Sequence, residues 1–296
     1  MPSLAENSKK KKELTNAEKE KKSETKKKNF HASKDKDYGS NAQKPDMDEF
    51  MFDLQKEKHL EMLNEWQNQK AKIEQETIEQ CKSRKWLAHK PKLLTASNFG
   101  KVCRRRKDTP CAKMVQLLLY PRVLNVPAVE YGRENEEIAR RESSKKENIE
   151  IKKCGLFIDA SIPYLGASSD GVIGEDGIVE IKCPKSADVT PEETITTNKS
   201  VKAIFIDSTG NALRKTHPYF YQVQGQLHIT GRKYCLFCLW TKKGIMSIRV
   251  EKDDDFWKRE MEPKLTQFYL NCMLPEIVYS RYNRGMPIRE PQNIKK

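Results

Sequence analysis

Two acidic residues and a lysine follow one another at a spacing that suits phosphodiester chemistry. Nine residues separate Asp170 from Glu180, and Lys182 follows Glu180 after one further residue. In an extended strand alternate side chains share a face, so Glu180 and Lys182 point one way while Val179 and Ile181 point the other. Because burying two charges on an otherwise apolar strand is costly, this pair indicates a function.

Two converging carboxylates are the ligands that a hard divalent cation such as Mg²⁺ prefers. A cation held by Asp170 and Glu180 would withdraw charge from phosphoryl oxygens and lower the pKa of an attacking water. Lys182 would orient or deprotonate that water and neutralise the developing negative charge. The pattern therefore predicts phosphodiester hydrolysis, and the simpler alternative is an ordinary ion pair between Glu180 and Lys182.

These three residues resemble the D-x(n)-E-x-K signature of the PD-(D/E)XK nuclease superfamily. Further motifs in the same order narrow the resemblance to the YqaJ viral recombinases and phage lambda-type exonucleases. The motifs are Leu94 to Ser97, Gly132 with Glu136 four residues later, Ile181 to Pro184, and Tyr219 to Leu227. The resemblance covers roughly Trp86 to Tyr282.

The resemblance implies a role for each matching residue. Asp170 and Glu180 resemble the principal metal ligands, Glu136 resembles a helical carboxylate that helps to hold the metal, and Lys182 resembles the catalytic lysine. The main-chain carbonyl of Ile181 is expected to touch a metal ion. Mg²⁺ is the implied cofactor, and Mn²⁺ is expected to substitute for it.

Further residues are expected to support catalysis or to bind substrate. Gln222 and Tyr219, on the same helix face as Gln226, resemble residues that support the active site, and we assign Gln222 to catalysis and Tyr219 to substrate binding. Ser97 resembles a residue near a phosphate pocket, where a helix N-terminus suits an anion.

One motif departs from the family pattern. Relatives usually carry an Arg several residues before the Thr-Ala-Ser motif, whereas this chain offers His89, Lys90 and Lys92. We expect Lys90 to contact the substrate. Since lysine lacks the two-pronged guanidinium, the resemblance leaves recognition of a 5′-phosphate in doubt.

Several neighbouring residues have competing interpretations. Glu134 and Glu137 compete with Glu136 for the helical metal-ligand role, and only the spacing from Gly132 selects Glu136. His217 and His228 are interpreted as structural, because nothing nearby completes a metal or nucleophile set. A CxxC pair also occurs, but it lies in the apolar run 234–240, which favours a buried strand over a zinc site.

The elements that must position these residues can be outlined from periodicity and turn residues. Residues 47–87 follow a helical pattern, and helices are expected near 95–103, 109–118, 131–142, 218–231 and 254–272. Strands are expected at 149–151, 155–158, 165–173, 178–183, 201–214, 234–241 and 245–251. Gly174 to Gly177 reads as a hairpin turn that returns Asp170 towards Glu180.

The predicted fold is α/β, with a restriction-endonuclease-like core in which a mixed central β-sheet is flanked by helices. The predicted organisation places a lysine-rich disordered tail at 1–46, a helical N-terminal extension at 47–85, a nuclease domain at 86–285 and a C-terminal tail at 286–296. The basic clusters of the first tail are open to three interpretations: a nuclear address, a DNA-binding arm or a solubilising segment.

The net charge of +14 favours polyanionic partners, because each cation that neutralises a phosphate releases a counterion. Duplex DNA ends are the expected substrate, with a single-strand annealing protein as a possible partner and an oligomer as a possible state. No membrane association is expected. Scattered cysteines indicate an intracellular protein, nuclear in a eukaryotic host and otherwise cytoplasmic.

The predicted function is therefore metal-dependent DNA hydrolysis, by resemblance a 5′ to 3′ exonuclease acting on double strands in recombination or replication of a virus or mobile element. The alternatives are a catalytically inactive nucleic-acid-binding protein with the same fold, an endonuclease, or a nuclease acting on RNA.

Overall fold

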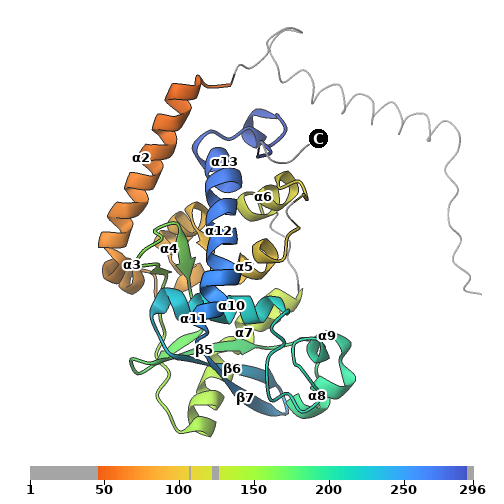
Figure 1. Ribbon diagram of the computed structural model, residues 1–296. Helices are drawn as coiled ribbons and strands as arrows, with labels where there is room; N and C mark the ends of the chain where they lie inside the picture. The colour runs from red at the N-terminus through yellow and green to blue at the C-terminus, as the bar shows by residue number, and fades with distance from the viewer. Residues whose placement is uncertain (1–45, 107, 122–126, 292–296) are drawn as a thin grey trace, which may run out of the picture. The chain divides into compact units, whose positions relative to one another are not determined.

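The computed structural model describes residues 46–106, 108–121 and 127–291 (Figure 1). All described helices and strands belong to one compact unit that begins at Glu49. The lysine-rich segment expected at 1–46 lies outside the described residues except for its last one.

Helices occupy most of the N-terminal part, as the pattern over 47–87 predicted. They are α2 (Glu49–Asn68), α3 (Lys70–Glu76), η1 (Gln80–Lys82), α4 (Arg84–His89) and η2 (Lys90–Lys92). Leu63 of α2 and Ile73 of α3 are both buried in the main core. The N-terminal helices therefore pack on the rest of the fold.

The central sheet has four strands in the order β4-β5-β6-β7. The strands are β4 (Gly171–Ile173), β5 (Gly177–Lys182), β6 (Tyr234–Thr241) and β7 (Gly244–Glu251). Strands β5 and β6 are parallel, whereas the two outer pairs are antiparallel, which confirms the predicted mixed sheet. The turn 174–176 joins β4 to β5 as expected, and Gly174 has a φ of 50°, which glycine adopts easily.

The predicted strand 165–173 is divided between two sheets. Its first part is β3 (Leu165–Ala167), which joins β1 (Leu94–Thr95) and β2 (Phe157–Ile158) in a small separate sheet. Its second part is β4. The chain leaves one sheet and enters the other at Ser168 to Asp170, so the expected catalytic aspartate lies at the junction.

The β-structure predicted over 201–214 is reduced to one isolated antiparallel bridge between Phe205 and Leu213. The backbone amide of Ile206 donates to the carbonyl of Ala212 at 2.9 Å, and that of Arg214 to the carbonyl of Ile204 at 2.8 Å. The first two residues of the range belong instead to α9 (Lys199–Lys202), which follows α8 (Pro191–Thr197). Asn198 caps α9 by accepting from the amides of Ser200 and Val201, a local bond that favours helix over strand. The expected strand at 149–151 is likewise only a bridge, between Lys152 and Val172.

Helices cover both faces of the four-stranded sheet. Helix α10 (Pro218–Thr230) packs on one face, where Val223 and Leu227 join Ile178 and Phe237. Helix α7 (Pro127–Glu147) covers the other face. There Ala139 joins an apolar cluster that includes Val179, Ile181, Cys238 and Trp240. Both faces of β5 are therefore buried, and the CxxC cysteines are strand residues of the core.

Helix α10 lies unusually close to α5 (Ala96–Cys103), the helix that follows the Thr-Ala-Ser motif. A Cβ on Gly225 would come within 2.3 Å of the Phe99 ring, and a Cβ on Gly100 within 2.6 Å of the backbone of Pro218. Both positions therefore require glycine, and this contact joins the N-terminal motif to the helix that carries Gln222.

The remaining helices complete the fold. Helix α6 (Ala112–Leu119) begins three residues after the predicted start at 109. The C-terminal helical segment runs through α11 (Asp254–Phe256), a π-helical stretch (Trp257–Met261), α12 (Glu262–Phe268), a second π-helical stretch (Tyr269–Met273), α13 (Leu274–Val278) and the short η5 (Tyr282–Arg284). Residues 286–291, expected as the start of a tail, lie against the body: Ile288 is buried and Glu290 accepts from the amides of Cys111 and Ala112.

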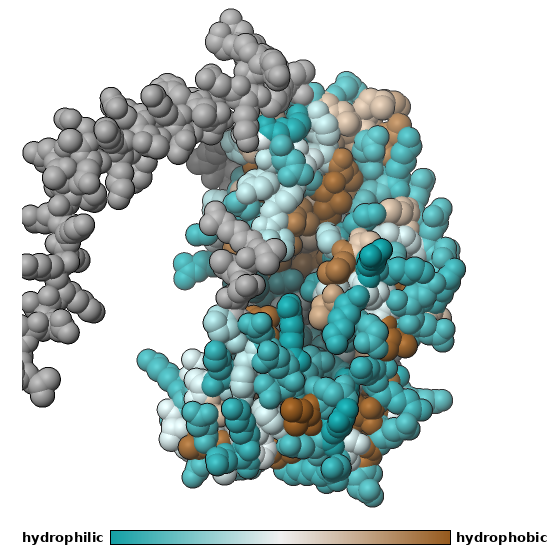
Figure 2. Space-filling view, turned by 180° about the vertical axis from the view of Figure 1, so that it is seen from behind, coloured by the Kyte–Doolittle hydropathy of each residue, from teal (hydrophilic) through white to brown (hydrophobic). Residues whose placement is uncertain are grey.

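The surface is mostly hydrophilic, with local apolar areas. Figure 2 shows teal side chains over most of one face and brown ones gathered in its upper part. Exposed large apolar residues include Phe50, Leu87, Leu117 and Val129. Among the described helices, none combines the length and the apolar character needed to cross a membrane.

Candidate active site

The β4–β5 hairpin places the two principal carboxylates opposite each other. Gly171 pairs with Val179, so the next antiparallel position sets Asp170 opposite Glu180. The Asp170 amide donates to the carbonyl of Val179 at 3.0 Å, and the Asp170 Oδ2 accepts from the Ile181 amide at 2.6 Å. Asp170 and Glu180 therefore flank the last pair of the hairpin, which makes them near neighbours.

Glu180 is buried, and polar partners surround its carboxylate. Its Oε1 accepts from Gln222 Nε2 at 2.6 Å and from Lys182 Nζ, while its Oε2 accepts from Gln226 Nε2 at 2.7 Å. The side chain is only 3% exposed, so without these donors the charge would be very costly to bury. Gln222 thus contacts the carboxylate of Glu180.

Lys182 lies between Glu180 and an aromatic ring. Its ammonium sits 4.6 Å from the ring centroid of Tyr219, at the start of α10. Burial alone would lower the pKa of Lys182, but Glu180 and Asp170 outweigh that effect and raise it. In this arrangement Lys182 is a cation that donates a hydrogen bond to Glu180.

A cavity of about 630 Å³ adjoins these residues. Glu136, from the middle of α7, lines it together with Asp170, Ile181, Lys182 and Tyr219. Glu137 instead pairs with Arg140 and Arg141 away from this cavity. Of the three glutamates that competed for the metal-ligand role, Glu136, which the spacing from Gly132 had selected, is therefore the one that lines the cavity.

The carboxyl groups at this cavity have shifted pKa values. Burial, followed by the charges of Glu180 and Glu136, raises the pKa of Asp170 well above its ordinary value. Burial also raises the pKa of Glu136, to which Glu180 adds, while Arg140 opposes the shift. Acidic groups crowded in this way are stabilised in their charged form by a nearby cation.

The donor set suits a hard divalent cation, which one or two carboxylates and water can hold. Among the described side chains, no three His, Cys, Asp or Glu residues lie together closely enough to form a metal site. The Glu180 carboxylate accepts from Lys182 and from two glutamines of α10, whereas Glu136 comes from α7. A site built on Asp170 and Glu180 as a pair fits this geometry.

Two of the expected substrate-binding residues lie elsewhere. Lys90 lines a separate cavity of about 560 Å³, where its ammonium is 4.1 Å from the ring of Trp86. Ser97 is exposed on the first turn of α5 and contacts Thr95 Oγ1 at 3.4 Å. Neither residue lines the cavity of Asp170, whereas Tyr219 does.

Both histidines have structural contacts, as interpreted from the sequence. His217 caps α10 by accepting from the backbone amide of Tyr219 at 3.2 Å. His217 also lines the cavity of Asp170. His228 contacts Asp159 at 3.3 Å and stacks on Trp257 with a centroid distance of 3.9 Å.

Two residues of this site were missing from the set assigned from the sequence. Gln226 is fully buried and links Glu180 to the main-chain carbonyl of Ser168. Its spacing of four residues from Gln222 was the available signal. Arg133 lines both the cavity of Asp170 and the cavity of Lys90. In the sequence, nothing distinguishes Arg133 from other arginines on charged helices.

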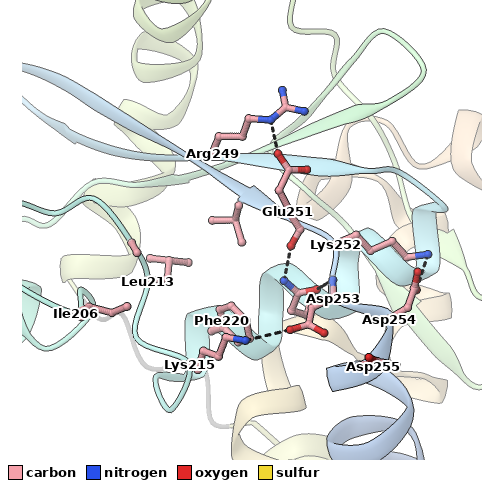
Figure 3. A pocket seen from close by; sticks show the side chains of 13 residues that line it. Ile206, Leu213, Lys215, Phe220, Arg249, Glu251, Lys252, Asp253, Asp254 and Asp255 are labelled. Atoms are coloured by element: carbon pink, nitrogen blue, oxygen red, sulfur yellow. Dashed lines mark hydrogen bonds and ion pairs between the residues drawn. The ribbon is translucent and has the colours of Figure 1, made fainter.

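A third cavity, at the end of β7, carries mixed charges (Figure 3). Six of its seven charged side chains pair with one another: Arg249 with Glu251, Lys252 with Asp254, and Lys215 with Asp253. Asp253 also caps α11 through the Phe256 amide. This internal pairing leaves no convergent group for catalysis, in contrast to the cavity at Asp170.

Solved structures that resemble this chain include nucleases. The alkaline exonuclease LHK-Exo from Laribacter hongkongensis is 25% identical, with a TM-score of 0.52, over 68% of this chain and 96% of that one. The same exonuclease in complex with dAMP gives 24% identity and a TM-score of 0.51, over 67% and 95%. These folds confirm the predicted restriction-endonuclease-like core. A search of curated proteins found no match.

A family model for the YqaJ-like viral recombinase domain matches residues 85–233, which include Glu136, Asp170, Glu180, Lys182 and Gln222. The match spans the segment from α4 to the turn before β6, and so contains every motif on which the resemblance rested. The chain therefore belongs to the YqaJ-like viral recombinase family.

Proposed function

We propose that this protein is a divalent-metal-dependent DNA nuclease, an exonuclease that degrades double-stranded DNA from its ends in the 5′ to 3′ direction. The observation that carries the proposal is the position of Asp170 opposite Glu180, beside Lys182 and the cavity that Glu136 lines. Membership of a recombinase family favours a role in the recombination or replication of a virus or mobile element.

The choice of DNA ends as substrate rests on the solved relative. That relative is an alkaline exonuclease, and this chain covers 96% of its length. The net charge of +14 suits a polyanionic substrate, whose counterions are released on binding. The 5′ to 3′ direction is carried over from the phage exonucleases that the motifs resemble.

Each residue has a role in the proposed hydrolysis. Asp170 and Glu180 would hold Mg²⁺, or Mn²⁺ in its place, with Glu136 and the carbonyl of Ile181 as further ligands. The bound ion would supply Lewis acidity at the phosphoryl group and an activated water. Lys182 supplies a positive charge and an N–H donor for the developing charge on phosphorus oxygens. Gln222 and Gln226 keep the Glu180 carboxylate oriented.

A linear duplex labelled at one 5′ end or one 3′ end tests this function. With Mg²⁺, wild-type protein should release label from the 5′ end as short products before any 3′ label is lost. EDTA should stop cleavage. Asp170→Asn and Lys182→Ala should each lower the rate by at least about a hundredfold, the scale expected when one electrostatic contact to the transition state is removed.

The matched control is Glu175→Gln, which removes an exposed carboxylate from the turn of the same hairpin. It should leave the rate unchanged. Covalently closed circles and RNA duplexes serve as alternative substrates, and cleavage of circles would point instead to an endonuclease. Full activity in both active-site variants would rule out this assignment of the site.

A further inference from the structure

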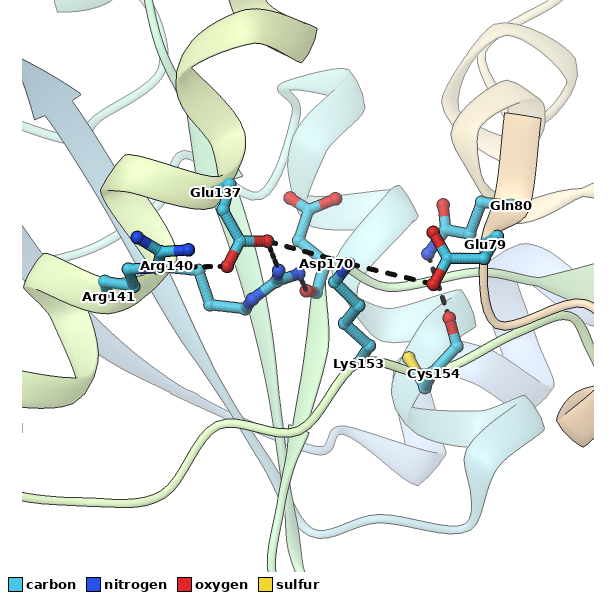
Figure 4. A network of polar contacts seen from close by, with 8 residues as sticks. All are labelled: Glu79, Gln80, Glu137, Arg140, Arg141, Lys153, Cys154 and Asp170. Atoms are coloured by element: carbon cyan, nitrogen blue, oxygen red, sulfur yellow. Dashed lines mark hydrogen bonds and ion pairs between the residues drawn. The ribbon is translucent and has the colours of Figure 1, made fainter. Parts of the chain in front are cut away.

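The peptide that precedes Asp170 is held by a residue from the N-terminal helices. Gln80 Nε2 donates to the carbonyl of Ser169 at 2.9 Å and to the carbonyl of Cys154 at 3.1 Å. Figure 4 shows the Gln80 amide approaching from the helix end on one side of Asp170. Gln80 lies outside residues 85–233, the segment that the family model matches.

The backbone of Gln80 adopts a conformation that most residues avoid. Its φ is 44°, in the left-handed region where a side chain with a Cβ is strained. The backbone N–H of Gln80 donates to the backbone carbonyl of Thr77 at 2.8 Å. The backbone carbonyl of Gln80 accepts from the backbone N–H of Ser83 at 2.8 Å. A glycine would adopt this backbone conformation more easily. The strained backbone therefore occurs together with the two hydrogen bonds that the glutamine side chain makes.

The same helices are firmly joined to the segment that Gln80 contacts. Glu74 accepts from the Gly155 amide at 2.9 Å, and Thr77 Oγ1 accepts from the Leu156 amide at 2.8 Å. A Cβ on Gly155 would lie 1.9 Å from the Glu74 carbonyl oxygen, so the two backbones are in direct contact. Gln80 is therefore held in a fixed position relative to these strands. Its side chain in turn can fix the position of the Ser169 carbonyl.

Asp170 is also held from the other side. Arg140, one turn after Glu136 on α7, donates from Nη1 to the carbonyl of Asp170 at 3.2 Å. Arg140 is buried and ion-paired with Glu137. Figure 4 shows the two supports on opposite sides, with Lys153 between Glu137 and Glu79 at 3.8 Å from each. The carbonyls before and after the Asp170 Cα are thus each fixed by a different helix.

We propose that Gln80 is a positioning residue for Asp170, and that the N-terminal helices are a working part of the active site. The inference rests on the proposed nuclease function. Asp170 lies at the junction where the chain passes from β3 to β4, so its carboxylate direction depends on two peptide planes. Arg140 fixes one plane and Gln80 the other.

Two variants of the full chain separate positioning from stability. Gln80→Ala removes the amide but keeps the strained Cβ, whereas Gln80→Gly removes the amide and relieves the strain. Gln80→Gly should therefore melt at the higher temperature of the two. Both should lower kcat by about tenfold with KM within about twofold, since a small displacement of a catalytic group slows the chemical step. Gln75→Ala, at an exposed position of α3, is the control.

Hydrogen–deuterium exchange provides a readout that does not depend on activity. Residues 165–173 should exchange faster in both Gln80 variants and at the wild-type rate in Gln75→Ala. The proposal is overturned if residues 165–173 exchange at the wild-type rate in both Gln80 variants, or if both variants keep the wild-type kcat. It is also overturned if the variant with the lower melting temperature has the lower kcat, because stability would then explain the loss. An inactive wild-type protein would reject the proposed function, and the exchange result would then decide by itself whether Gln80 positions Asp170.

Discussion

Asp170 lies opposite Glu180 one step beyond the last paired residues of the β4–β5 hairpin, and each carboxylate is held by different partners. Asp170 accepts from the amide of Ile181, whereas Glu180 accepts from two glutamine amides and a lysine. The backbone thus orients one carboxylate, and side chains of α10 orient the other. Substitutions in α10 should therefore disturb the Glu180 carboxylate more than the Asp170 carboxylate.

Replacing Gln226 should cost both stability and activity. Gln226→Leu would remove the donor to Oε2 of the buried Glu180 carboxylate and to the Ser168 carbonyl, with an expected loss of about 1–3 kcal/mol in the free energy of unfolding. Urea denaturation measures this loss. Gln222→Leu is the comparison, and its cost should be smaller because Gln222 is only half-buried and contacts Glu180 alone. Equal stability of wild type and Gln226→Leu would contradict this prediction.

Divalent metal should bind to the folded protein without DNA. We expect titration calorimetry with Mn²⁺ to detect binding to wild-type protein and at least about tenfold weaker binding to Asp170→Asn, because a neutral amide is a poorer ligand for a hard cation. Glu175→Gln should bind as wild type does. Identical titrations for wild type and Asp170→Asn would show that the ion binds elsewhere.

Asp159 should make stability depend on acid. Burial tends to raise the pKa of this carboxyl, but His228 and the amides of Ser161 and Ile162 outweigh it and lower the pKa below its ordinary 3.8. A carboxylate with a lowered folded pKa stabilises the protein above the unfolded pKa, and that contribution disappears as pH falls through the folded value. The stability gap between wild type and Asp159→Asn should therefore be greatest near neutral pH and shrink below about pH 3.8. A gap that stays constant with pH would exclude this origin.

Two glycine-to-alanine changes should have opposite effects. Gly225→Ala places a Cβ 2.3 Å from the Phe99 ring and should destabilise the protein by about 1–3 kcal/mol through overpacking. Gly132→Ala, in α7, meets no atom within 4 Å and should stabilise it by about 0.5–1 kcal/mol through helix propensity. Thermal unfolding of both variants checks the pair. A stable Gly225→Ala protein would mean that α5 and α10 can separate.

The sequence determined the parts of this protein that depend on short-range geometry. The nine-residue spacing from Asp170 to Glu180, with a glycine turn between them, predicts an antiparallel pair whose opposite residues meet. Alternation along β5 correctly placed Glu180 with Lys182 and Val179 with Ile181. Period and turn residues depend on a few neighbouring residues, so they can be read without the rest of the chain.

Only the tertiary structure decided how distant segments share the site. It divided 165–173 between two sheets at Asp170, reduced the β-structure expected over 201–214 to a single bridge, and separated Ser97 and Lys90 from the cavity that Asp170 lines. It also brought Gln80 to the Ser169 carbonyl beside Asp170, and Gln226 to the Glu180 carboxylate. A glutamine far away in sequence becomes a partner of a buried carbonyl or carboxylate only when packing excludes water from both, and no local pattern records that pairing.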